Sequence, residues 1–135
     1  MSKLQIVKEN IIKEIENNPK YEIQSIKSIE HPLNKTLMSF NIIFSDSEKS
    51  IRYSLVGYEN EIKEIGILLE ASFFTGIEKD IEESKEIDNF NVEINNFKKG
   101  KEALVKLLYK GNPDKFDFYL ALNTLIEEGI NKLIY

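Results

Sequence analysis

The sequence predicts an α+β fold, in which a small antiparallel sheet of three to four strands carries about five helices packed mainly on one face. Two observations indicate this class. Residues 38–55 alternate apolar and polar side chains with the period of two that a half-buried strand requires. The segments at 2–17 and beyond residue 60 repeat their apolar residues mostly at helical spacing. Strands and helices are therefore segregated along the chain.

The first predicted element is an amphipathic helix over residues 2–17. Ser2 is a candidate N-cap, and Asn17-Asn18-Pro19 ends the helix. A first strand is predicted at 21–30, where the spacing of apolar residues changes near Ser25. A β-bulge and a short irregular segment both explain this change.

A hairpin is the clearest local signal in the chain. Met38, Phe40, Ile42 and Phe44 lie on one face of its first strand. The polar residues 46–50 then turn the chain, and the alternation resumes from Ile51 to Leu55. One apolar face and one mostly polar face predict an antiparallel sheet that is covered on one side.

Two helices are predicted after the hairpin. Ile62, Ile65, Leu69 and Phe73 recur at helical spacing, and Gly76 is placed to end this first helix. A shorter helix is predicted at about 77–87.

The segment 90–97 fits either a strand or a helix. Its asparagines weaken the helical alternative, so a strand is favoured. Beyond it the pattern predicts a helix over residues 101–110, ended by Gly111-Asn112-Pro113, and a last helix from Asp114 onward.

Size and composition predict a single globular domain over residues 1–135. Hydrophobic residues make up 41% of the chain and charged residues 30%, which is ordinary for a folded protein. There is no cysteine, which excludes disulfides, thiolate nucleophiles and cysteine-based zinc sites. The N-terminus lacks the apolar core of a signal peptide, and no apolar run is long enough to span a membrane. We expect a cytoplasmic protein without a membrane partner.

Negative charge is concentrated in the middle of the chain. Ten acidic residues and three lysines lie between Glu59 and Asp88, a net charge of −7, whereas the whole protein carries −5. A surface of one sign attracts basic proteins and repels nucleic acid. Arg52 is the sole arginine, which also argues against nucleic-acid binding.

The sequence offers little basis for catalysis. His31 is the single histidine, and no nucleophile-elbow, dinucleotide-binding or phosphate-loop motif occurs. On the predicted helix, Glu78, Glu82 and Glu86 would form one row that a divalent cation could bind, but no ligating loop accompanies them. Their neighbouring lysines favour a solvated or partner-binding face instead. We expect no enzyme activity, no metal and no cofactor.

The function predicted from these features is non-catalytic protein binding. Bacterial immunity proteins, which neutralise toxins, share this physical type: they are small, acidic and free of catalytic motifs. The alternatives are an acidic homodimer resembling a secretion chaperone and, less favoured, a carboxylate-based enzyme. The predicted contacts to a basic partner, such as a toxin or effector domain, are Glu78, Asp80, Glu82, Glu83, Glu86 and Asp88.

Overall fold

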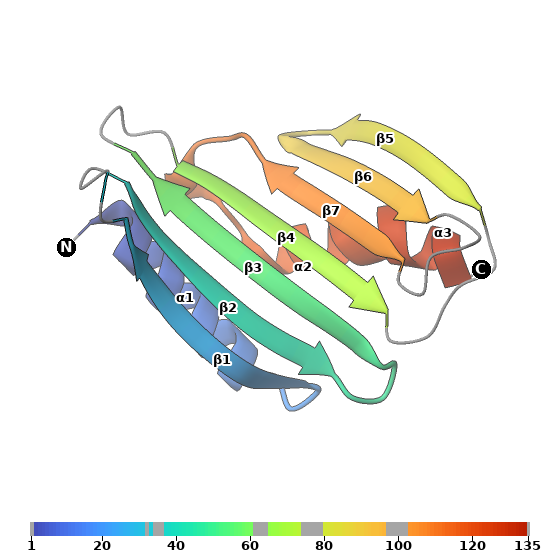
Figure 1. The fold of residues 1–135 in the computed structure, drawn as a ribbon, viewed down its shortest axis with the longest axis horizontal. Coiled ribbons are helices and arrows are strands. Elements are labelled where there is room, and N and C mark those ends of the chain that lie inside the picture. The colour runs from blue at the N-terminus through green and yellow to red at the C-terminus, as the bar shows by residue number, and fades with distance from the viewer. Residues whose placement is uncertain are drawn as a thin grey trace.

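The computed structural model describes residues 2–31, 33, 37–60, 65–73, 80–96 and 103–134. In chain order these form one long helix, seven strands and a C-terminal helical region (Figure 1). All seven strands belong to one antiparallel sheet with the order β1-β2-β3-β4-β7-β6-β5. Strands β5 and β1 are therefore the two edges.

The first helix confirms the prediction for the N-terminus. Helix α1 spans Lys3–Glu16, and the Ser2 side chain accepts a hydrogen bond from the Gln5 backbone N–H. Three residues of its apolar stripe are buried against the sheet: Leu4, Ile11 and Ile15. The helix lies behind the first three strands, where it contacts β1 and β3.

The first three strands form the predicted meander. They are β1 (Tyr21–Glu30), β2 (Met38–Asp46) and β3 (Ile51–Glu59). The register of β1 against β2 shifts between Ile23 and Ser25, so the bulge alternative is the right one. On β2 and β3 the large alternating side chains point to one face and are buried there: Phe40, Ile42, Phe44, Tyr53 and Leu55.

The helix predicted across 60–73 is wrong. Residues Ile65–Phe73 form strand β4, and residues 61–64 lie outside the described part of the chain. Ile67, Leu69 and Phe73 alternate on the buried face, which is the period of a strand. Leu68 lies between them on the opposite face and half-buried, so the run of apolar residues resembled a broad helical stripe.

The helix predicted at about 77–87 is also wrong. Residues Ile81–Ile87 form the edge strand β5, and residues 74–79 lie outside the described part. Segment 90–97 contains strand β6 (Phe90–Asn96), as favoured from the sequence. The two strands form a hairpin with the loop Asp88-Asn89, where Asp88 has a φ of 52°.

The helix predicted over 101–110 is wrong as well. Residues Leu104–Tyr109 form strand β7, which lies between β4 and β6. Val105 and Leu107 are buried on the helix side of the sheet, whereas Leu104 and Leu108 lie half-buried on the other side. Apolar residues on both faces hid the period of two.

The predicted C-terminal helix is present. A short 3₁₀ turn, η1 (Pro113–Lys115), precedes a continuous helical stretch made of α2 (Phe118–Leu125), the π-helical turn η2 (Ile126–Ile130) and α3 (Asn131–Ile134). Asp117 caps α2 by accepting a hydrogen bond from the Leu120 backbone N–H. This stretch packs on β4, β6 and β7.

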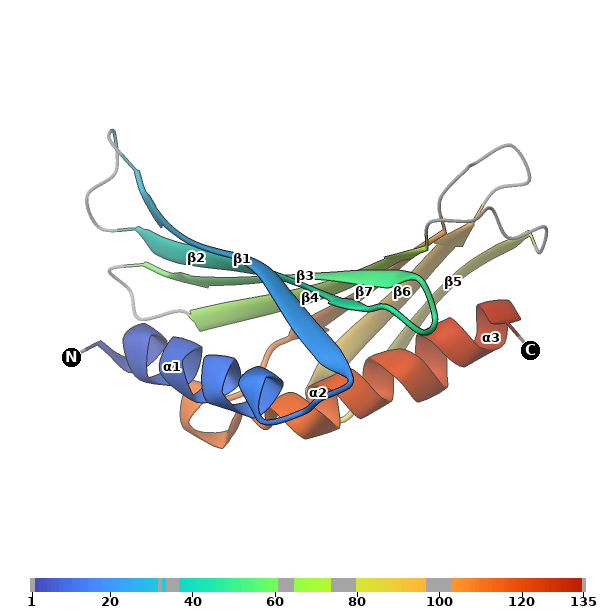
Figure 2. The ribbon, with the colours of Figure 1, turned by 90° about the horizontal axis from the view of Figure 1, so that it is seen from below.

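The architecture is therefore mostly sheet, and the predicted helix-rich α+β class is wrong. Seven strands replace the expected three to four, and two helical regions replace the expected five across the described residues. Both regions lie on the same side of the sheet, and the opposite side, termed here the open face, carries no helix of the described part (Figure 2). In that part, no helix is long and apolar enough to cross a membrane.

Candidate functional site

The acidic residues of β5 are divided between the two faces of the sheet. Register with β6 pairs Glu83 with Ile94 and Lys85 with Val92, and both partners are buried under the helices. Glu83 and Lys85 therefore point toward the helix side. Glu82, Ser84 and Glu86 alternate with them and point to the open face.

On the helix side, the charges of β5 are held by the C-terminal helical stretch. Lys132 Nζ donates a hydrogen bond of 2.8 Å to Glu83 Oε1, and Lys85 Nζ donates one of 3.0 Å to Glu128 Oε2. The hydrogen bond from Lys132 lowers the pKa of Glu83 below its ordinary value, with its positive charge adding to the effect. Glu83 is therefore paired within the chain, although its side chain stays 42% exposed.

On the open face, acidic side chains gather where β5 meets β6. Glu82, Ser84, Glu93 and Asn95 line a shallow depression of about 250 Å³, to which Glu83 contributes at its margin. Glu86 lies two residues further along β5, with Lys110 Nζ at 3.8 Å from its Oε1. Because both side chains of this ion pair are largely exposed, water screens their attraction.

We call the exposed acids of β5 and its two ends the acidic corner: Asp80, Glu82, Glu86 and Asp88. All four are exposed to solvent. Within the described part of the chain, Glu82, Asp80 and Asp88 form no ion pair with a lysine or arginine. Of the six predicted contacts, the structure thus brings four to this corner and engages Glu83 internally, while Glu78 lies outside the described residues.

The wider acidic stretch does not form one surface. Glu70, on the open face of β4, lies 3.8 Å from Lys106 of β7. Glu59 ends β3, and its Oε2 is buried without a hydrogen bond from the described residues. The charges of residues 59–88 are therefore spread over separate parts of the sheet. In the described part, only the acidic corner forms a continuous acidic surface.

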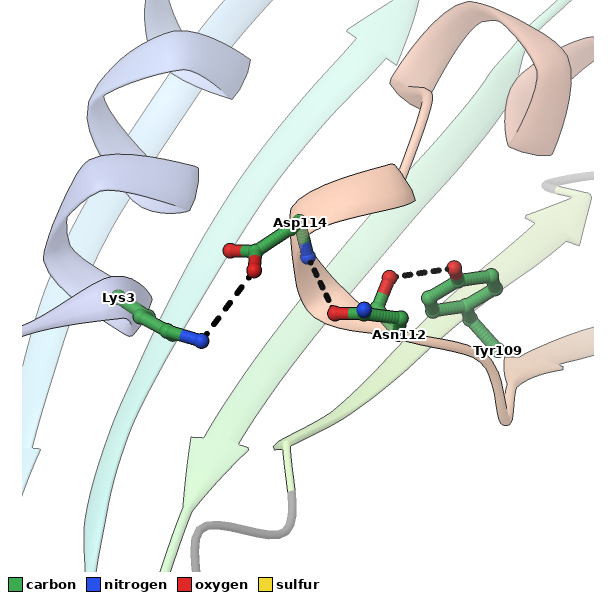
Figure 3. Close-up of polar contacts among 4 residues, drawn as sticks. All are labelled: Lys3, Tyr109, Asn112 and Asp114. Carbon is green, nitrogen blue, oxygen red and sulfur yellow. Dashed lines mark hydrogen bonds and ion pairs between the residues drawn. The ribbon is translucent and has the colours of Figure 1, made fainter.

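A second polar region lies between α1 and the segment before α2, and the sequence analysis did not predict it. Lys3 Nζ contacts Asp114 Oδ2 at 3.2 Å, and the Asp114 backbone N–H donates to Asn112 Oδ1 (Figure 3). Tyr109 Oη donates a 2.6 Å hydrogen bond to the Asn112 carbonyl. The Lys3–Asp114 contact joins residues 111 positions apart, so no local motif could have revealed it.

Beside this network lies a cleft of about 370 Å³ between α1 and the Pro113–Phe118 segment. Ile6, Val7 and Phe116 give it apolar walls, and Glu14 lies along it. Burial raises the pKa of Glu14, and the nearby charge of Asp117 adds to this effect. Glu14 Oε2 is itself covered and accepts no hydrogen bond from the described residues.

One further carboxylate is buried, at the turn between β2 and β3. Asp46 is 1% exposed, and its Oδ1 accepts hydrogen bonds from the backbone N–H groups of Glu48 and Lys49. Lys20 Nζ lies 3.4 Å from Oδ2. Burial raises the pKa of the adjacent Tyr53, with Tyr21 and Asp46 contributing. These contacts shape a turn, and none of the described clefts reaches them.

Neither His31 nor the carboxylates form a recognisable catalytic or metal arrangement in the described part. His31 Nε2 lies 3.2 Å from Ser39 Oγ, at the start of β2. No group of three histidine or carboxylate side chains is placed to hold a metal ion among the described residues.

Comparison with known proteins adds no assignment. The chain matches no protein family, no curated protein and no solved structure.

Proposed function

We propose that this chain is a non-catalytic protein-binding domain that engages a basic partner through its acidic corner. One observation carries the proposal: Glu82 and Glu86 project from the open face of an edge strand while Glu83, between them, is tied to the helix side. The acids that point outward thus lie on a strand that is paired with β6 along its whole length. Such a surface accelerates association with a basic protein and gives it a strong dependence on salt.

The class of partner that suits this surface is a protein with a basic groove or patch, such as a toxin or effector domain. An inhibitor of that kind would act as an immunity protein does, by occupying a positively charged site. Support comes from the exposed position of the four acids on and beside an edge strand.

The test is a charge reversal at the corner with a matched reversal elsewhere. A pull-down from native lysate at low salt first identifies the bound protein. The double variant Glu82→Lys with Glu86→Lys should then weaken its binding by about a hundredfold and flatten the salt dependence. The control Glu16→Lys with Glu48→Lys makes the same change of charge away from β5, at the end of α1 and in the β2–β3 turn, where both side chains are exposed.

An equal loss in both double variants would show that net charge alone matters, and no loss in either would remove the acidic corner from the binding surface. Thermal unfolding of each variant verifies that the sheet is intact.

The open face favours a second candidate, an acidic homodimer that holds an extended segment of another protein. Val56, Leu68 and Leu108 lie in register across β3, β4 and β7 and form a half-buried apolar row at its centre. Sedimentation of the purified protein separates the two candidates. A stable dimer without partner favours the chaperone-like function, and a monomer favours the inhibitor.

A further inference from the structure

Strand β5 ends the sheet, and β6 is its one neighbouring strand. Its outer edge therefore presents backbone N–H and C=O groups that no described strand pairs. Such an edge is a template for another strand. β5 runs over Ile81–Ile87, long enough for several pairs of backbone hydrogen bonds.

The hairpin geometry identifies which residues present these groups. Ile87 and Phe90 flank the two-residue loop and are register partners. In such a turn the flanking residues are hydrogen-bonded, and bonded and non-bonded pairs then alternate along an antiparallel ladder. Glu82, Ser84 and Glu86 fall in the non-bonded pairs, so their backbone groups point away from β6.

These residues are the same three whose side chains point to the open face. A strand added antiparallel to β5 would bond to their backbone groups, and the residues opposite them would share that face. The residues opposite Glu82 and Glu86 would be four positions apart, with the residue opposite Ser84 midway. Lysine or arginine at both outer positions would meet a carboxylate of opposite charge.

We propose that β5 receives an extended basic segment of the partner protein as an eighth strand, with basic residues at positions i and i+4. This inference rests on the proposed function, because it assigns the partner's chemistry at the same acidic corner. Lys132 and Glu128 form ion pairs with β5 on the helix side, and β6 pairs with β5 along its whole length. β5 is therefore an existing strand of the sheet and needs little ordering on binding.

Charge argues against a second copy of the chain as the occupant. Two β5 strands paired antiparallel about Ser84 would place Glu82 of one copy opposite Glu86 of the other, twice. Like charges directly opposite destabilise a strand pair. The same charges protect the edge from pairing with other copies of the chain. They therefore favour an incoming strand that carries positive charge.

The test uses short synthetic peptides and the full chain. The first peptide has two lysines four residues apart, a serine midway and threonines elsewhere. The second has the same composition with the lysines three residues apart, which places them on opposite faces of a strand. Fluorescence anisotropy at low salt should show the first binding about tenfold more tightly.

Backbone pairing is tested by methylating single amides of the first peptide. Methylation at the serine removes an N–H that faces β5 and should weaken binding about tenfold. Methylation at a neighbouring threonine, whose N–H faces away, is the matched control and should change binding less than about twofold. In the protein, Ser84→Pro removes one outward N–H, which an edge strand tolerates, and should also reduce binding about tenfold.

The outcomes separate the two proposals. Strand addition is overturned if the two lysine spacings bind alike and the two methylated peptides also bind alike. If Glu82→Lys with Glu86→Lys still abolishes binding in that case, the proposed function at the acidic corner is retained. If the charge reversal changes neither peptide binding nor partner binding, both the proposed function and strand addition are overturned. Absence of binding by every peptide, or a dimer that Ser84→Pro dissociates, also overturns the basic strand as occupant.

Discussion

Lys132 Nζ lies 2.8 Å from Glu83 Oε1, so the last turn of the C-terminal helical stretch is joined to the edge strand of the sheet. The neighbouring contact between Lys85 and Glu128 repeats this connection with the charges reversed. The register of β5 against β6 sets which face of β5 lies toward the helices, and both ion pairs form on that face. Glu82 and Glu86 alternate with these residues and therefore point to the open face.

We predict that Glu83 contributes to stability in a pH-dependent manner. Its pKa is lower in the folded protein than the ordinary value of 4.5, so the unfolded chain binds more protons as the pH falls below that value. The contribution is present above pH 4.5. It is lost as the pH falls through the folded pKa. In Glu83→Gln, urea unfolding should show a shallower loss of stability with acidification.

Lys132→Gln should produce the same shallower pH dependence, because it removes the partner that lowers the Glu83 pKa. High salt should reduce the difference from the wild type. Glu127→Gln, at an exposed position on the same helical stretch, serves as the control. A pH dependence equal to that of the wild type in Glu83→Gln would contradict the assignment.

Glu14 is predicted to act in the opposite direction. Burial and Asp117 raise its pKa, so its ionised form is less favourable in the folded protein than in the unfolded chain. This penalty is absent at acidic pH and develops as the pH rises from 4.5 through the folded pKa. Glu14→Gln should therefore stabilise the protein at neutral pH, by no more than about 1 kcal/mol because solvent screens this half-buried group.

The stabilisation by Glu14→Gln should disappear in acid, where the wild-type carboxyl group is protonated in both states. Chemical unfolding at neutral and acidic pH measures the difference. Glu16→Gln, an exposed position on the same helix, should leave stability nearly unchanged at both. Destabilisation of Glu14→Gln at neutral pH would show that the carboxylate has a stabilising partner.

Gly129 packs tightly against the sheet. A Cβ atom at this position would lie 2.3 Å from Val105 Cγ1, on the buried face of β7. Gly129→Ala should therefore destabilise the protein by about 1–3 kcal/mol through overpacking, despite the better helix propensity of alanine. Asn123→Ala, exposed on the same helical stretch, is the control for propensity.

The contact with Val105 makes the Gly129 prediction specific. Combining Gly129→Ala with Val105→Ala should cost less than the sum of the two single variants, because removal of Cγ1 leaves room for the new methyl group. Thermal or urea unfolding of the four proteins completes the cycle. Additive effects would show that the strain lies elsewhere.

The sequence predicted those parts of the fold in which one face of an element is polar. In β2 the alternation of Phe40, Ile42 and Phe44 with smaller residues was visible, and α1 showed a clean stripe. It failed where both faces carry apolar side chains, as in β4 and β7, because Leu68 and Leu108 on the open face obscured the period of two.

The edge strand β5 escaped detection for the opposite reason. Its central residues, 82–86, are all exposed, so burial imposed no alternation on their sequence. The acidic composition of the candidate site was evident from the sequence. The division of its side chains between two faces became visible only once residues 81–87 were known to form a strand. The pairing of β4 with β7 is non-local, and no pattern within either segment encodes it.

Asp46 should be the most sensitive polar residue of the β2–β3 turn. It is buried, and its Oδ1 accepts two backbone N–H groups, from Glu48 and Lys49. Asp46→Ala leaves these donors without their acceptor and should cost about 1–3 kcal/mol. Asp46→Asn keeps an oxygen at the same position and should cost less than half as much, although it loses the contact with Lys20.

Chemical unfolding of both variants measures the difference, with Glu48→Ala at an exposed position of the same turn as the control. The distinction matters because the charge and the acceptor oxygen have different roles. If Asp46→Asn were as destabilising as Asp46→Ala, the contact of Oδ2 with Lys20 would contribute more to stability than the two hydrogen bonds in the turn. Since that lysine is itself partly exposed, we expect the hydrogen bonds to the turn to dominate.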